Sequence, residues 1–369
     1  MSGMERHLFP GNNTPSGFFS YYEYILNQDE GQKIYCLKGG PGAGKSTLIG
    51  RIGKRFLEQG EDVDFFHCSA DRNSLDAILL KKRNIAVLDG TSPHVIDPVN
   101  PGAVDTIVNL GDCWNEHGIR ANRHRIIESH KRCSSLFSGA YHYLAAAEQL
   151  YDNLREIYSF RIKPEEYTKL AAGWIGKELA HKQISSRRGA TKKFFACAVT
   201  PQGIVSELSS LLNCVKKVYR IETCVGLEPE RILKPFAESA LNRGFDLELY
   251  YSPLKPETGL EHIICPELGL ALITDSDLQH WSGAEDGRKQ EIITVNLCEK
   301  AGTVISGALA ELERDSRERF YPLLDQAVYC LSKAKEEHDR LESYYIPHID
   351  FDKVRNLEQQ ITEEISEMG

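Results

Sequence analysis

The sequence predicts an α/β fold that occurs twice in the chain, as a tandem duplication of a three-layer module with a parallel sheet. Residues recur at an offset of 184 to 187 along most of the 369 positions. In each copy, apolar runs of strand length alternate with an amphipathic helical stretch, which favours a parallel sheet covered by helices. Each copy then ends in a longer segment of helical periodicity.

The internal repeat can be followed in short identical or similar segments. TPSG at 14–17 returns as TPQG at 200–203, and VNL at 108–110 returns at 295–297. A register that drifts by only three residues over this span indicates a duplication. We therefore expect a first domain at 1–186 and a second at 187–369. Their helical segments are expected at about 113–185 and about 299–369.

The first copy contains the clearest elements. Strands are predicted at 34–38, 62–68, 85–89 and 106–110. A helix is predicted at 46–57, because Leu48, Ile49, Ile52 and Phe56 fall on one face. Beyond residue 120 the apolar spacing becomes helical in both copies, and these stripes are interpreted as core or inter-helix packing.

The strongest motif is a glycine-rich segment between the first of these strands and the helix. In IYCLKGGPGAGKSTLI, Gly39-x₄-Gly44-Lys45-Ser46 matches the phosphate-binding loop (P-loop) pattern in the strand–loop–helix context that it requires. Glycines let successive N–H groups point at phosphate oxygens, and the helix start adds its positive dipole end. The predicted nucleotide-binding residues are Gly39, Gly40, Pro41, Gly42, Ala43, Gly44, Lys45, Ser46 and Thr47.

Individual roles follow from the chemistry of such loops. Lys45 is expected to reach the β- and γ-phosphates, the Ser46 hydroxyl to ligate Mg²⁺, and Thr47 to help hold the α-phosphate. Asp89 ends an apolar strand and is predicted to complete the Mg²⁺ site. Asp71 competes for that role, and it alternatively positions an attacking water or a substrate hydroxyl. The predicted cofactors are ATP and Mg²⁺, with Lys45, Asp89 and Asp71 as candidate catalytic residues.

The second copy has lost the loop chemistry. Its corresponding segment is VYRIETCVGLEPERIL, in which Pro229 stands opposite Lys45 and Glu230 opposite Ser46. Only Gly226 remains, opposite Gly42. Proline lacks the N–H that the loop needs, and carboxylates have the wrong charge to face phosphates. The second domain is therefore predicted to be a degenerate module that binds no triphosphate in the usual way.

Composition restricts the partners and the compartment. A net charge of −9 and a pI of about 5.8 argue against a general nucleic-acid binder. No apolar run approaches the ~20 residues that span a bilayer, so no membrane partner is expected. The ten cysteines form no CxxC pair and no export signal is apparent, which favours the cytoplasm. A nucleoside triphosphate and an unknown protein or small molecule remain as partners.

Four segments together resemble a known group of proteins. They are RHLFPGNNTPSGF, LKGGPGAGKSTL, HCSADRNSLDAI and LDGTSPHVIDPVNPGAVDTIVNLGD. The chain is similar to an uncharacterised family of tandem-duplicated bacterial P-loop ATPase-like (nucleotide-kinase-like) proteins, over its whole length and most specifically over the first 112 residues. The resemblance implies the fold of the P-loop NTPase superfamily. In that family a second phosphate loop can occur in the C-terminal half, and here it is absent.

Three functions are compatible with these observations. The leading hypothesis is an Mg²⁺-dependent ATPase or ATP-driven switch with one active and one degenerate module. The first alternative is a small-molecule or nucleotide kinase whose acceptor hydroxyl lies near Asp71, Thr91 and His94. The second is a nucleotide-sensing scaffold that binds ATP without turnover. The strand-following loops lack an N/T-K-x-D motif, which favours adenine over guanine.

Overall fold

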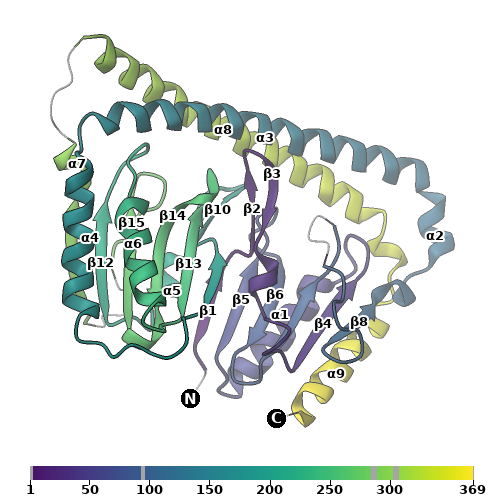
Figure 1. The fold of residues 1–369 in the computed structure, drawn as a ribbon. Helices are drawn as coiled ribbons and strands as arrows, with labels where there is room; N and C mark the ends of the chain where they lie inside the picture. Colours follow the sequence, from purple (N-terminus) through teal and green to yellow (C-terminus); the bar gives the residue numbers. More distant parts are fainter. Residues whose placement is uncertain (1–2, 93–95, 284–288, 302–306, 369) are drawn as a thin grey trace.

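The computed structural model describes residues 3–92, 96–283, 289–301 and 307–368, and contains two six-stranded sheets (Figure 1). The first sheet has the order β1-β5-β6-β7-β4-β8, and only β6 runs antiparallel to its neighbours. Its strands are β1 (Glu5–Leu8), β4 (Lys33–Lys38), β5 (Val63–His67), β6 (Leu75–Leu80), β7 (Ile85–Asp89) and β8 (Asp105–Asn109).

The second sheet repeats this topology, with the order β16-β12-β15-β14-β13-β9 and a single reversed strand, β14. Its strands are β9 (Thr191–Phe194), β12 (Lys217–Glu222), β13 (Leu247–Ser252), β14 (Lys255–Cys265), β15 (Leu270–Asp275) and β16 (Glu291–Asn296). The predicted duplicated α/β fold is thus confirmed. Both sheets are mostly parallel but mixed, because one strand in each, β6 or β14, runs antiparallel to its two neighbours.

The two copies meet through equivalent backbone positions. Phe9 N–H donates to the Phe195 carbonyl at 3.1 Å, and Phe195 N–H donates back to Phe9 at 3.0 Å. Phe195 is the repeat counterpart of Phe9, so the halves are related by an approximate two-fold axis at this pair. Two hairpins flank the axis: β2 (Gly11–Thr14) with β3 (Gly17–Ser20), and β10 (Cys197–Thr200) with β11 (Gly203–Ser206).

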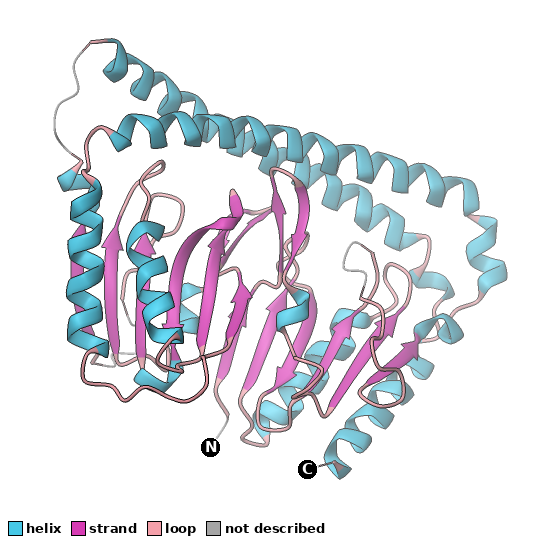
Figure 2. Cartoon of the chain, in the orientation of Figure 1, coloured by secondary structure: helices cyan, strands magenta, loops and turns pink. Residues whose placement is uncertain are grey.

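Long helices run between the two copies, and the terminal helix of each copy packs on the other copy (Figure 2). α3 (Arg123–Ser159) and α8 (Ala308–Ser343) pack side by side and antiparallel across both sheets. α4 (Pro164–Leu179), from the first copy, packs on α6 (Glu230–Leu241) of the second. α9 (Phe351–Glu367), from the second copy, packs on α1 (Lys45–Glu58) of the first. The helical segment of each copy therefore covers the sheet of the other.

Two tyrosines at equivalent positions mark this exchange. The Tyr35 hydroxyl of the first sheet donates to Glu364 of α9 at 3.0 Å. The Tyr219 hydroxyl of the second sheet donates to Glu178 of α4 at 2.6 Å. The predicted apolar stripes form the interface of the long helices, with Leu144 and Leu331 fully buried.

The remaining helices are short. They are α2 (Glu116–Ala121), α5 (Leu208–Leu211), α7 (Leu297–Lys300) and the 3₁₀ turns η1 (Tyr22–Tyr24), η2 (Leu110–Cys113), η3 (Pro266–Leu268) and η4 (Ile346–His348). None of the helices in the described part of the chain is both long and apolar enough to cross a membrane.

Candidate functional site

The glycine-rich loop, residues 39–44, joins β4 to α1 at the carboxyl ends of the parallel strands of the first sheet. Gly42 and Gly44 have φ values of 69° and 84°, in the left-handed region that other residues rarely adopt. A Cβ on Gly39 would lie 2.9 Å from the Leu110 side chain. Ala43 is 2% exposed and belongs to the core under α1, which anchors the loop. The sequence thus places glycine where this loop needs positive φ or close packing.

Lys45 is the first residue of α1 and its side chain folds back over the loop. Its Nζ donates to the carbonyls of Gly39 and Gly40, both at 2.9 Å, and lies 3.6 Å from Asp89 Oδ2. The other carboxylate oxygen of Asp89 accepts from the Thr91 N–H at 2.8 Å and from its hydroxyl at 2.5 Å. Two of the predicted catalytic residues, Lys45 and Asp89, therefore lie in contact at the carboxyl ends of adjacent parallel strands.

Ser46 is held by a strand that sequence reasoning did not identify. Its hydroxyl oxygen accepts the Leu75 N–H, at the start of β6, at 2.8 Å. This contact uses one lone pair, so the second lone pair and the hydroxyl hydrogen remain for other partners. Thr47 is exposed and Pro41 is half-buried.

Asp71 lies in the connection from β5 to β6 and has several partners. Its carboxylate accepts from the Asn73 N–H at 3.1 Å and from the Ser74 hydroxyl at 3.3 Å. Lys335 of α8 forms an ion pair with it at 3.3 Å. These contacts fix a turn and connect it to the long helix. His94, named above as part of an acceptor site, lies outside the described residues.

The end of α8 and the turn after it cover the loop. Glu342 accepts a hydrogen bond from the Gly42 N–H at 3.1 Å. A Cβ on Gly42 would lie 2.8 Å from Ile346, and one on Gly40 would lie 3.2 Å from Trp114 and from Tyr345. Sequence reasoning missed these residues because most of them lie about 300 positions from the loop and carry no motif.

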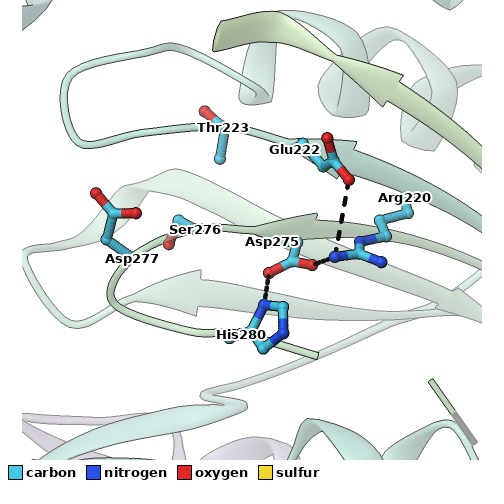
Figure 3. A pocket seen from close by; sticks show the side chains of 7 residues that line it. All are labelled: Arg220, Glu222, Thr223, Asp275, Ser276, Asp277 and His280. Carbon is cyan, nitrogen blue, oxygen red and sulfur yellow. Dashed lines mark hydrogen bonds and ion pairs between the residues drawn. The ribbon is translucent and has the colours of Figure 1, made fainter. Parts of the chain in front are cut away.

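The second sheet has a polar cavity of about 310 Å³ where its β12 and β15 end (Figure 3). Asp275, the repeat counterpart of Asp89, is buried there between Arg220, with which it forms an ion pair, and His280 Nδ1 at 2.9 Å. Its lining residues are Arg220, Glu222, Thr223, Asp275, Ser276, Asp277 and His280. The same strand ends thus carry a lysine-and-glycine site in one copy and an acidic pocket in the other.

The second loop keeps part of the backbone geometry. Gly226 has a φ of 97°, as Gly42 has a positive φ in the first copy. Pro229 caps α6, which begins at Glu230, so no lysine stands at this helix start. Pro229 and Glu230, which replace Lys45 and Ser46 of the first copy, therefore lie at the equivalent strand-to-helix turn.

Comparison of the sequence with models of protein families gives no match. The comparisons with curated proteins and with solved structures also give none. The assignment of chemistry to the two strand-end sites therefore depends on their residues alone.

Cys224, at the position in the second loop that corresponds to Gly40, has an unusual environment. A hydrogen bond from Cys298 and the charge of Arg317, whose guanidinium lies 3.2 Å from the sulfur, lower the pKa of Cys224 to about 7 despite its burial. A thiolate at neutral pH reacts faster with alkylating agents than a thiol does.

We expect the rate at which iodoacetamide alkylates Cys224 to rise with pH through a midpoint near 7. Peptide mass spectrometry measures the extent of alkylation at this cysteine. Arg317→Gln removes the guanidinium charge and should move the midpoint to higher pH. Lys333→Gln, which removes a cation elsewhere on α8, is the control. An unchanged midpoint in Arg317→Gln would contradict this explanation.

Proposed function

We propose that the chain binds one ATP with Mg²⁺ at the glycine-rich loop and hydrolyses it, as a P-loop NTPase with one active module. The observation that carries this proposal is the contact of Lys45 with Asp89 under a loop whose glycines have left-handed φ values. A cation, a carboxylate and inward-facing amides at one helix start are the components that phosphoryl-transfer sites share.

The residues suit a hard divalent cation. The Ser46 hydroxyl accepts one hydrogen bond from the described residues, which leaves a second lone pair for a metal ion, and Asp89 adds a carboxylate at the neighbouring strand end. These two groups would hold Mg²⁺, which neutralises charge on the β- and γ-phosphate oxygens when it is bound. Lys45 would exchange the Gly39 and Gly40 carbonyls for the phosphate oxygens, where its charge opposes the negative charge of the transition state.

Hydrolysis is favoured over transfer to an acceptor hydroxyl by the contacts of Asp71. Its carboxylate is engaged by Asn73, Ser74 and Lys335, which supports a positioning role rather than that of a base. The degenerate second loop, with Pro229 and Glu230 at its helix start, supports a single nucleotide per chain.

The wild-type protein tests this proposal in two assays. Calorimetric titration with ATP and Mg²⁺ is expected to give one site per chain, and a phosphate-release assay is expected to show turnover without any added acceptor. ADP formation that requires a pool of small metabolites would indicate a kinase instead. Tight binding without turnover would indicate a nucleotide sensor, and no binding would overturn the proposal.

A further inference from the structure

The carboxylate of Glu342 lies on the backbone N–H of Gly42, at 3.1 Å. Backbone amides of such a loop form an anion-binding concavity, so this carboxylate occupies the kind of position that a phosphate oxygen takes. The contact is part of a larger cover, because Tyr345 and Ile346 pack on Gly40 and Gly42. A triphosphate on the loop needs the space and the amide that this segment uses.

The duplication provides an independent comparison. Arg155 of α3 is the repeat counterpart of Glu342, and it lies beside the second loop. A Cβ on Gly226 would lie 2.5 Å from the Leu154 side chain and 3.1 Å from the Arg155 backbone nitrogen. A helix end from the opposite copy therefore covers the loop in both halves of the molecule.

The two covering helix ends differ in charge, with Arg155 on α3 and Glu342 on α8, and the two loops beneath them differ in charge as well. The second loop carries Glu228 and Glu230, and burial raises the pKa of Glu230 to about 7 while the nearby charges of Lys234 and Arg155 act to lower it. The first loop offers amides and Lys45. The helix end beside each loop thus carries a residue of opposite charge: Arg155, whose backbone lies beside the acidic second loop, and Glu342, which accepts the Gly42 N–H of the first loop.

We propose that Glu342 is an intramolecular competitor for the phosphate site, so that ATP displaces it together with the end of α8. Two anions at one amide repel each other, and a triphosphate with Mg²⁺ makes more contacts than one carboxylate. Lys335 on the same helix contacts Asp71, and Tyr321 contacts Asp277 of the second-copy cavity at 3.0 Å. Displacement of α8 would thus change contacts at the carboxyl ends of the strands in both sheets. This inference rests on the proposed nucleotide binding.

Calorimetric titration with a non-hydrolysable ATP analogue and Mg²⁺ tests the competition directly. Glu342→Gln keeps the shape of the side chain but removes its charge, and should bind the analogue about tenfold more tightly than wild type, since a charged acceptor makes the stronger hydrogen bond. Glu336→Gln is the matched control, because this exposed glutamate of α8 pairs with Lys333 and should leave the affinity unchanged.

Hydrogen exchange supplies a second measurement. In the wild type, the analogue should accelerate amide exchange over residues 338–350, because this segment leaves the loop. Equal affinities for the three proteins, with unchanged exchange over 338–350, would overturn the role of Glu342 and leave nucleotide binding intact. Failure of every variant and of wild type to bind the analogue would overturn the proposed function, and this inference with it.

Discussion

Lys45→Ala is expected to lower the rate of ATP hydrolysis by at least about 100-fold, the loss found when one preorganised group that stabilises transition-state charge is removed. The side chain of Lys45 is only 10% exposed, and Asp89 and two loop carbonyls fix its Nζ. Its charge therefore acts in a poorly solvated position, where electrostatic interactions are stronger than in water. Single-turnover phosphate release at saturating ATP measures the effect on the chemical step.

Lys54→Ala is the control for this substitution. Lys54 is exposed to solvent and lies more than two turns further along the same helix, roughly 13 Å from Lys45 at 1.5 Å per residue, so its replacement should leave the rate as in wild type. Thermal unfolding would establish that both variants are folded. Wild-type turnover in a folded Lys45→Ala variant would show that this loop is not where ATP is hydrolysed.

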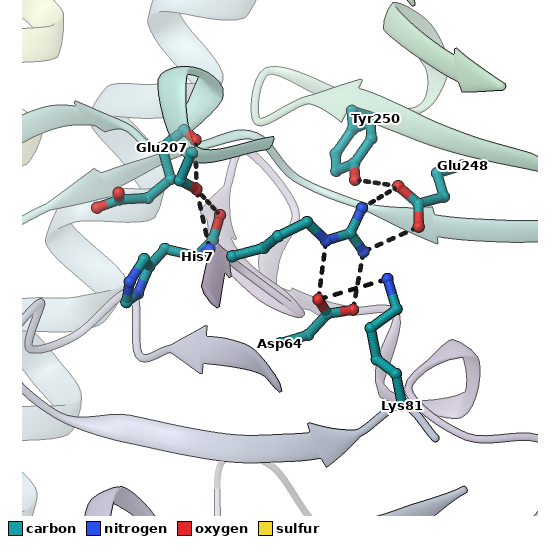
Figure 4. Close-up of polar contacts among 8 residues, drawn as sticks. His7, Asp64, Lys81, Glu207, Glu248 and Tyr250 are labelled. Atoms are coloured by element: carbon teal, nitrogen blue, oxygen red, sulfur yellow. Dashed lines mark hydrogen bonds and ion pairs between the residues drawn. The ribbon is translucent and has the colours of Figure 1, made fainter. Parts of the chain in front are cut away.

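Arg6→Ala is expected to reduce the free energy of unfolding by about 3–5 kcal/mol, the cost of leaving a buried ion-pair network without one partner. Arg6 is 3% exposed and donates to Asp64, twice at 2.8 Å, and to Glu248, twice at 2.9 Å. Figure 4 shows Asp64 and Glu248 on either side of this contact, with Tyr250 beside Glu248. Urea denaturation measures the difference, and coincident spectroscopic probes would establish a two-state transition.

The size of the effect follows from the position of the two carboxylates. Asp64 and Glu248 occupy equivalent places in the two copies, and one guanidinium pairs with both across the two-fold axis, with Lys81 3.8 Å from Asp64 as a second cation. Arg188→Ala is the control, since Arg188 and Glu238 form an ion pair with both side chains more than half exposed. Such surface pairs contribute roughly 0–1 kcal/mol. A similarly small loss in Arg6→Ala would contradict the predicted role of the buried network.

The same network predicts the sign of a pH effect. Burial acts to raise the pKa of Glu248, but Arg6 outweighs it and lowers the value to about 2. The pKa of a glutamate in an unfolded chain is about 4.3. The stabilisation from the depressed pKa is therefore present above that value and is lost as the pH falls toward 2. The stability difference between wild type and Arg6→Ala should narrow over this acidic range.

Much of the first sheet was predictable, because β4, β5, β7 and β8 are apolar runs with clear ends. β6 was missed although Leu75–Leu80 is almost entirely buried, since Asp76 interrupts its pattern and a polar turn precedes it. β1 was missed because ERHL has the composition of a surface segment. It pairs in parallel with β5, and its Arg6 is buried against Asp64 and Glu248, partners from both copies that no local pattern contains.

The residues of the candidate site also fall into those that the sequence predicts and those that it does not. The proximity of Lys45 to Asp89 could be expected from the sequence, since the loop follows β4, Asp89 ends β7, and neighbouring parallel strands end at the same edge of a sheet. The contact of Glu342 with Gly42 could not, because it depends on α8 crossing from one sheet to the other. Spacing within a motif predicts local geometry, and long-range placement depends on packing between elements.

The crossed placement of α4 and α9 also has a consequence for the history of the molecule. In a polypeptide with a single repeat, the helix that packs on the sheet (α1 or α6 here) would lack its covering helix. The terminal helix of a second polypeptide would have to take that place. The present chain has the organisation of a homodimer that exchanges its terminal helices and whose subunits became joined end to end. Fusion would then free one half to diverge, because its intact twin is always supplied by the same gene.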